Sequence, residues 1–176
     1  MVLLDLLKRE KAALHDAWLS KTLETYPRDA RSFFKRENNK FANPVGQTLS
    51  AELSALLDCL LYECETDSLC RHLEELMKIR SVQQFTPSRA VVFILMLKDA
   101  VKEIFTAELK DPEMMNEFVS FEREIDQVAL FAFDLYVKTR EKMYQLRVAE
   151  VKRQVSTLMK RSDYFVGGSG FDGDRQ

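Results

Sequence analysis

Residues 111–161 read DPEMMNEFVSFEREIDQVALFAFDLYVKTREKMYQLRVAEVKRQVSTLMKR, and this stretch decides the fold class of the chain. It contains no Gly and its one Pro is residue 112, so nothing inside it breaks a helix. Asp111 is a favourable N-cap, and Pro112 suits the first helical position. An unbroken helix would span roughly 75 Å at ~1.5 Å per residue, too long for a domain of this size. We therefore predict that residues 140–161 project as a linker-like helix, pair with a second chain or fold back.

Apolar residues recur along this helix at a spacing of three or four, which gives it one apolar face. The face continues past Thr139 with a shift in register. A long helix with such a face is typical of helices that pair, so we predict a homodimer. The residues predicted to meet the partner are Phe118, Ile125, Leu135, Tyr144, Val148, Val151, Val155 and Leu158.

The composition of the 176 residues indicates a single all-α domain. Apolar residues make up 46% of the chain, which excludes a disordered protein. Of the 5 Gly, four follow Arg161, so residues 1–161 hold too few turns for a sheet protein. We expect helices over 2–24, from 27 onward, and over 44–65, 66–82, 87–109 and 112–161. Residues 1–161 then form one domain, and residues 162–176 form a flexible tail.

The distribution of charge and apolar residues excludes several classes of function. A net charge of −2 gives no basic footprint for nucleic acid. The longest uncharged apolar run, residues 90–97, is far shorter than the ~20 residues of a membrane span. The N-terminal pattern is not that of a signal peptide, so we expect a cytoplasmic protein without a transmembrane segment. Lys and Arg dominate residues 138–161, which predicts either a solvated face or a surface for a membrane, nucleic acid or an acidic partner.

Three cysteines and a histidine, Cys59, Cys64, Cys70 and His72, lie within fourteen residues. Structural zinc sites favour ligands about two to four residues apart, closer than these. Cys59 lies in an apolar run and is expected in the core, whereas Cys64 and Cys70 flank a predicted turn. We predict no metal and no cofactor, with metal or redox binding by the three cysteines as the alternative. His15 and His72 are expected at the surface or its boundary, not as haem ligands.

Two further sets of polar residues have a structural interpretation. Asn43 precedes Pro44, which is typical of a helix N-cap followed by a first-turn Pro. Lys98, Asp126 and Asp134 lie in apolar surroundings, so they either pair between helices or face outward. No nucleophile accompanies these carboxylates, and we predict no catalytic site.

Two segments are not explained by helix periodicity, FANPVGQTL at 41–49 and KIRSVQQFTPSRA at 78–90. With IDQVALFAFDLYVKTRE at 125–141 they resemble the RsbRD N-terminal domain family, the sensor domains of the RsbT co-antagonist proteins of the bacterial stressosome. The resemblance covers about residues 18–151. It implies an all-helical, globin-like sensor domain that dimerises and does not bind haem. Family members often continue into a STAS domain, and because this chain ends soon after the linker-like helix, we expect a stand-alone sensor.

We therefore predict a non-enzymatic signalling protein, a sensor or adaptor that transmits a state to a partner through its long helix. Its ligand pocket is predicted at Asn43, Pro44, Arg80, Gln83, Phe85 and Thr86. Capping of the helix that starts at Pro87 is the structural interpretation of the residues around Phe85. The alternative function is a small-molecule or metal-binding helical protein that uses an internal cavity or the Cys59, Cys64 and Cys70 group.

Overall fold

The computed structural model describes residues 2–36, 43–62, 64–83 and 85–167, and the side chains of 2–34, 43–62, 64–83 and 85–160. Within this part of the chain every regular element is a helix, which confirms the all-α prediction. The elements are α1 (Val2–Arg9), α2 (Lys11–Glu24), α3 (Arg28–Arg36), α4 (Pro44–Tyr62), α5 (Thr66–Val82), α6 (Pro87–Ile104), the short 3-10 helix η1 (Glu108–Lys110) and α7 (Pro112–Gly167).

Side-chain caps fix two of the helix starts. The Oδ1 atom of Asp111 accepts hydrogen bonds from the backbone N–H of Glu113 at 2.7 Å and of Met114 at 3.2 Å. The Oδ1 atom of Asn43 accepts one from the backbone N–H of Gly46 at 2.9 Å. These bonds satisfy N–H groups that a helix leaves free in its first turn. Both N-cap predictions are confirmed.

Several helix boundaries differ from the sequence prediction, among them the end of α4, which lies at Tyr62 and not at residue 65. The first helix divides at Glu10, which has φ −97° and ψ 20°. The helix from Pro87 ends at Ile104, and η1 follows it as a separate turn. The last helix continues past Arg161 to Gly167, while residues 168–176 of the predicted tail and residues 37–42 between α3 and Asn43 lie outside the described residues.

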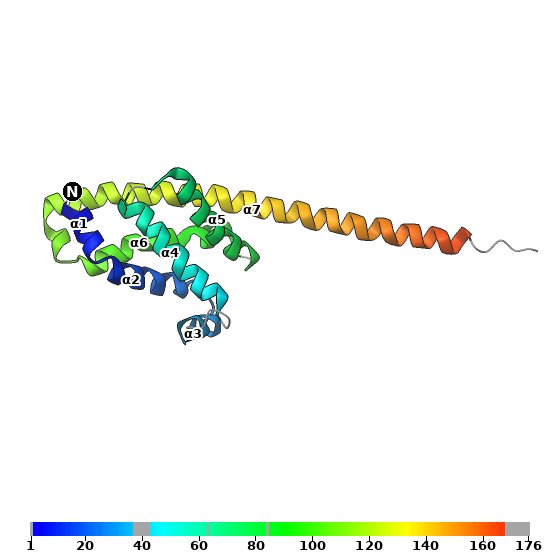
Figure 1. Cartoon of the computed structure of the whole chain (residues 1–176), viewed down its shortest axis with the longest axis horizontal. Coiled ribbons are helices and arrows are strands. Elements are labelled where there is room, and N and C mark those ends of the chain that lie inside the picture. Colours follow the sequence, from blue (N-terminus) through cyan, green and yellow to red (C-terminus); the bar gives the residue numbers. More distant parts are fainter. Residues whose placement is uncertain (1, 37–42, 63, 84, 168–176) are drawn as a thin grey trace, which may run out of the picture. The chain divides into compact units, whose positions relative to one another are not determined.

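The chain divides into two compact units, residues 1–139 and residues 140–176. In the first unit, α2 packs against α6 and α4, and α4 packs against α5 (Figure 1). The apolar middle of α6 contributes Val91, Phe93, Ile94 and Leu97 to the core, although Leu95 is 37% exposed. The Trp18 Nε1–H donates to the backbone oxygen of Phe93 at 2.6 Å, and the two rings are stacked. Trp18 thus joins α2 to the middle of α6.

The first part of α7 completes the core of this unit. Its buried side chains are Phe118, Phe121, Ile125, Val128, Ala129, Ala132 and Tyr136. The ammonium of Lys98 pairs with Asp126 at 2.7 Å, and that of Lys102 pairs with Glu122 at 2.8 Å, so two ion pairs join α6 to α7. Of the two alternatives expected for these residues, pairing holds for Lys98 with Asp126, and exposure holds for Asp134.

The prediction that the apolar face of α7 meets a partner along its whole length is wrong for the first half of the helix. Phe118 and Ile125 are fully buried in their own unit, and Leu135 packs against the same core. Phe118 and Ile125 therefore stabilise the unit in which they lie and are not available to a second chain. Amphipathic periodicity shows that a helix face is covered, but it does not say by which chain.

Candidate functional site

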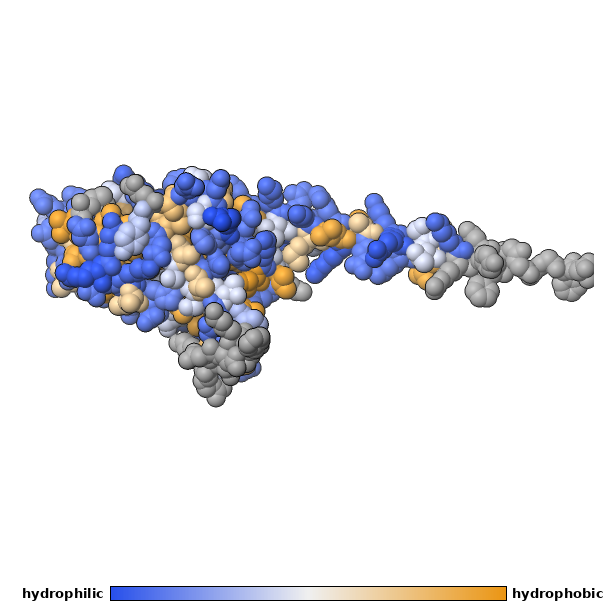
Figure 2. Space-filling model, in the orientation of Figure 1, coloured by the Kyte–Doolittle hydropathy of each residue, from blue (hydrophilic) through white to orange (hydrophobic). Residues whose placement is uncertain are grey.

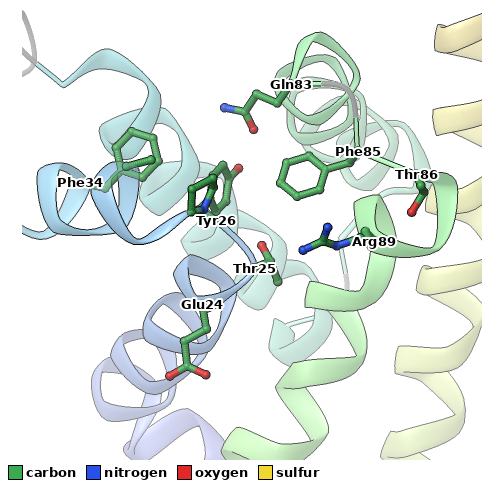
Figure 3. A pocket seen from close by; sticks show the side chains of 10 residues that line it. Glu24, Thr25, Tyr26, Phe34, Gln83, Phe85, Thr86 and Arg89 are labelled. Atoms are coloured by element: carbon green, nitrogen blue, oxygen red, sulfur yellow. The ribbon is translucent and has the colours of Figure 1, made fainter.

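A cavity of about 550 Å³ lies where the end of α2, the start of α3, the end of α5 and the start of α6 meet (Figure 3). This volume is within the range of small-molecule sites, about 300–1,000 Å³. Its wall combines aromatic and polar side chains. The lining residues are Glu24, Thr25, Tyr26, Pro27, Ala30, Phe34, Gln83, Phe85, Thr86 and Arg89.

Aromatic rings from three segments build the apolar side of the cavity. Tyr26 lies edge-on to Phe34 and to Phe85, with 5.4 Å between ring centres in each case. Tyr26 follows α2, Phe34 belongs to α3, and Phe85 precedes α6, so this cluster joins elements distant in sequence. The Tyr136 hydroxyl of α7 donates to the backbone oxygen of Phe85 and holds that segment in place. The cavity is therefore supported by α7 as well as by the helices that line it.

A buried cation packs against this wall. The Arg80 side chain of α5 is fully buried, and its guanidinium carbon lies 5.2 Å from the Tyr26 ring centre and 5.0 Å from that of Phe85. It also lies 4.4 Å from the Phe93 ring centre. Rings at these distances stabilise a cation through their negative faces. No carboxylate among the described residues forms an ion pair with Arg80.

The polar groups that contact Arg80 are uncharged, and they do not pair with all of its N–H donors. Its Nη1 donates to the backbone oxygen of Arg89 and its Nη2 to the Thr25 hydroxyl oxygen, both at 3.2 Å. Its Nε–H has no partner within the described part of the chain. Burial lowers the pKa of Arg80 to about 10, while Tyr26 and then Tyr136 act in the opposite direction. The side chain therefore carries its charge at neutral pH in a site that does little to balance it.

The Tyr26 hydroxyl is a second polar group without a partner. Tyr26 is 5% exposed, and its hydroxyl forms no hydrogen bond to any described residue. Burial raises the pKa of Tyr26, although the charge of Arg80 opposes that shift. An unmet buried donor costs about 1–3 kcal/mol. Tyr26 lines the cavity, and because its hydroxyl oxygen is itself buried, an acceptor in the cavity reaches it only after a local shift of the surrounding side chains.

The rim of the cavity carries positive charge and a helix start. Figure 3 shows Arg89 reaching toward Tyr26 between Thr25 and Phe85. Thr86 is the N-cap residue of α6, with φ −67° and ψ 154°, and its side chain makes no capping bond. The positive end of the α6 dipole therefore lies at the cavity. Glu24 is the acidic residue in the wall.

The structure separates the six residues predicted to form a pocket. Gln83, Phe85 and Thr86 line the cavity, and Arg80 packs behind its wall. Asn43 and Pro44 do not line it, because they begin α4. The Asn43 Nδ2–H donates to the Phe34 backbone oxygen at 3.1 Å, so Asn43 ties α4 to α3 and acts on the cavity through Phe34.

Sequence reasoning missed seven of the ten residues that line this cavity. Tyr26, Phe34 and Arg89 line the cavity and were not predicted there, and Thr25 contacts Arg80. The aromatic residues on either side of Pro27, Tyr26 and Phe34, were a usable signal, since small-molecule sites are lined mainly by apolar and aromatic side chains. Tyr26 and Phe34 meet residues of α5 and α6 only through tertiary packing, which the periodicity of the sequence does not predict.

The second unit holds a different feature, an apolar seam on α7. We use this name for Tyr144, Val148, Val151, Val155 and Leu158. Their exposed fractions are between 48% and 64%. Figure 2 shows orange, apolar surface interrupted by blue, hydrophilic surface along this helix. The spacing of four, three, four and three residues is that of the a and d positions of a heptad.

The cysteine group does not form the arrangement that metal binding requires. Cys59 and Cys64 form a disulfide with 4.7 Å between their Cα atoms, and Cys70 is a free, half-buried thiol. Cys59 is also only half buried, so its expected place in the core is wrong. Among the described residues no group of three or more His, Cys, Asp or Glu side chains is placed to hold a metal ion.

The histidines lie at the boundary of the first unit, as expected. The Nε2 atom of His15 is 3.0 Å from the Ser50 backbone oxygen, and the Nδ1 atom of His72 is 2.7 Å from a Glu52 carboxylate oxygen. Both are half buried and face polar groups.

In the parts of the chain that the structure describes, no helix has the length and hydropathy needed to cross a membrane.

Comparison with known proteins assigns the family. The model of the RsbT co-antagonist protein rsbRD N-terminal domain matches residues 12–151. An uncharacterized protein of Archaeoglobus fulgidus is 24% identical over 105 residues, which are 59% of this chain and 66% of that protein. The chain thus spans just under two thirds of the length of this curated relative. No solved structure matches the chain. Since the family model covers well over half of the chain, the protein belongs to the RsbT co-antagonist protein rsbRD N-terminal domain family.

Proposed function

We propose that this protein is a non-enzymatic, cytoplasmic sensor or adaptor in signal transduction, with a globin-like arrangement of its first unit. In this proposal the cavity beside Arg80 receives the stimulus, and the apolar seam of α7 passes the response to another chain. Membership of a family named for the RsbT co-antagonists supports a signalling role. The proposal extends this role to stressosome-like assemblies, where sensor domains act by contact with other proteins.

The observation that carries the proposal is the exposure of the seam. Val148, Val151 and Val155 are each about half exposed, although β-branched apolar side chains are normally buried. They recur with Tyr144 and Leu158 on one face of a helix, so a second helix can cover all five at once. A second copy of this chain carries the same stripe, which makes the pairing self-complementary. We therefore propose a homodimer formed through the seam.

The charges beside the seam set the conditions for that dimer. In the heptad that places Val148 and Val155 at a and Val151 at d, Arg147 occupies g and Lys152 occupies e. In a parallel pair these two residues of different chains face each other. Like charges oppose pairing at low salt, and salt screens them. The same residues are available to an acidic protein partner, which would bind more tightly at low salt.

Sedimentation velocity of charge variants tests the seam. The double variant Val151→Glu, Val155→Glu puts two carboxylates into the a and d layers, and we expect a monomer at micromolar concentration. The matched control is Ala149→Glu, Ser156→Glu, which adds the same charge at two b positions outside the seam. We expect this control to keep the wild-type mass. The proposal is wrong if both double variants behave alike.

A further inference from the structure

The cavity beside Arg80 combines three observations that together specify a ligand. The buried Tyr26 hydroxyl lines it and has no partner within the described part of the chain. The Arg89 side chain lines it and is exposed. A third group, the fully buried Arg80, packs behind its aromatic wall without an ion pair to any described carboxylate. One cation and a residue with an unpaired hydroxyl thus line a cavity of about 550 Å³, and a second cation lies behind its wall.

The charge around the cavity selects an anion. A buried cation is normally paired with a carboxylate, and Arg80 instead meets ring faces and neutral oxygens. The start of α6, at Thr86, adds the positive end of a helix dipole on the same side. Glu24 and Arg89 both line the cavity and are both exposed, so water screens their opposite charges alike. The buried charge of Arg80 therefore leaves the surroundings of the cavity net positive.

The shape of the wall selects the rest of the ligand. The rings of Tyr26, Phe34 and Phe85 meet edge to face and present apolar surface. Pro27 and Ala30 extend that surface without adding a polar side-chain atom. Small-molecule sites combine such apolar walls with a few polar groups that fix orientation. A free inorganic anion would leave these rings in contact with water.

We propose that the cavity binds a small organic carboxylate whose apolar body lies against Tyr26, Phe34 and Phe85. The carboxylate accepts a hydrogen bond from the Tyr26 hydroxyl and forms an ion pair with Arg89. Arg80 strengthens both contacts through its charge behind the wall, because it lies close to the rings of Tyr26 and Phe85. This inference rests on the proposed function and names the chemical class of its stimulus.

The experiment is a titration of the full-length, ¹⁵N-labelled protein followed by NMR. The probes are phenylacetate, its uncharged analogue phenylacetamide, and acetate, which lacks the apolar body. Probe concentrations reach about 10 mM, enough to saturate a site with a Kd of 1 mM. We expect phenylacetate to shift the amide signals of Tyr26, Phe85 and Arg89. We expect phenylacetamide to bind at least about tenfold more weakly, because it loses a charge-assisted hydrogen bond. We expect a similar loss for acetate, because it lacks the apolar contact with the rings.

Variants assign the two polar contacts. Tyr26→Phe keeps the ring and removes the hydroxyl, and we expect about tenfold weaker binding of phenylacetate. Arg89→Gln removes the exposed charge, and we expect a three- to tenfold loss, or roughly the effect of one partly screened ion pair. The control Arg71→Gln lies in α5 about 18 Å along the helix from Gln83 and should bind as the wild type does.

The outcomes separate this inference from the proposed function. If phenylacetamide binds as tightly as phenylacetate, the ligand need not be an anion. If acetate binds as tightly as phenylacetate, the ligand needs no apolar body. Signal shifts that avoid the cavity, or no shift at about 10 mM, overturn the site itself. A protein that is dimeric in these same samples keeps the proposed output through the seam, whichever ligand result is found. A monomeric protein that binds phenylacetate as described keeps the ligand and loses the dimer.

Discussion

The guanidinium carbon of Arg80 lies 4.4 Å from the centre of the Phe93 ring, in the interior of the first unit. Phe93 also receives the Trp18 indole N–H on its backbone oxygen, so the cation packs against the residue that joins α2 to α6. Ring faces stabilise a cation less than water does once the cation is desolvated. The positive charge is therefore held at a cost to stability, which is typical of a group retained for binding.

The variant Arg80→Met tests whether this charge serves folding. Methionine fills similar space without a charge, so it removes the desolvation cost together with the ring contacts and two hydrogen bonds. We expect the free energy of unfolding to stay within about 1 kcal/mol of the wild type, measured by urea denaturation. A loss of about 3 kcal/mol or more would show instead that the arginine is a structural element of the core.

The pKa shifts at the cavity predict a difference at alkaline pH. Burial raises the pKa of Tyr26, so above its ordinary value, about 10, the folded chain keeps a proton that the unfolded chain releases. This makes stability fall as pH rises through that window. The lowered pKa of Arg80 has the opposite sign, because above about 10 the folded chain loses its proton before the unfolded chain does.

Tyr26→Phe isolates the tyrosine contribution. Without the phenol, the decrease in unfolding free energy between about pH 9 and 11 should be smaller than in the wild type. Urea denaturation at the two pH values measures it. Tyr62→Phe, at an exposed ring at the end of α4, is the matched control and should follow the wild type. An identical decrease in Tyr26→Phe and the wild type would contradict the assignment of a raised pKa to Tyr26.

Local chemistry predicted several elements of this fold. Asp111 and Asn43 were identified as N-caps because a short polar side chain precedes a Pro at each site, and both caps are present. The break at Glu10 was missed, since no Pro or Gly marks it. The break changes the direction of the chain between Leu7 of α1 and Leu14 of α2, and both of these residues are buried. The sequence carries no local signal for it.

The candidate site was predicted only where it is local. Gln83, Phe85 and Thr86 lie between two helices that the sequence delimits, and they line the cavity. Tyr26 and Phe34 come from the other side of the unit, so their place depends on the packing of α2 and α3. The error at Phe118 has the same origin, because an apolar helix face looks identical whether its own domain or a partner covers it.

The contact between Trp18 and Phe93 predicts a stability effect. Trp18→Phe removes the indole N–H and part of the buried volume between α2 and α6. We expect a loss of about 2–3 kcal/mol in the free energy of unfolding, from the hydrogen bond and the space left behind. Circular dichroism during urea denaturation measures it, since the variant lacks the tryptophan fluorophore. An unchanged midpoint would contradict the tight packing of these helices.

The disulfide predicts the number of reactive thiols. With Cys59 and Cys64 joined, the unfolded oxidised chain should react with a thiol reagent at Cys70 alone. Reduction should expose all three cysteines and lower stability by about 2 kcal/mol, the loop-entropy contribution of so short a crosslink. Three reactive thiols in the unfolded protein prepared without reductant would contradict the pairing.

The central claim is that the seam of α7 joins this protein to a second chain, and its solution mass tests that claim most directly. Sedimentation equilibrium of the wild-type chain at micromolar concentration should give the mass of two chains. The dimer should tighten as salt rises from about 0.05 M to 0.5 M, because screening weakens the repulsion between Arg147 and Lys152. A mass of one chain, 20.5 kDa, at every salt concentration would contradict the claim.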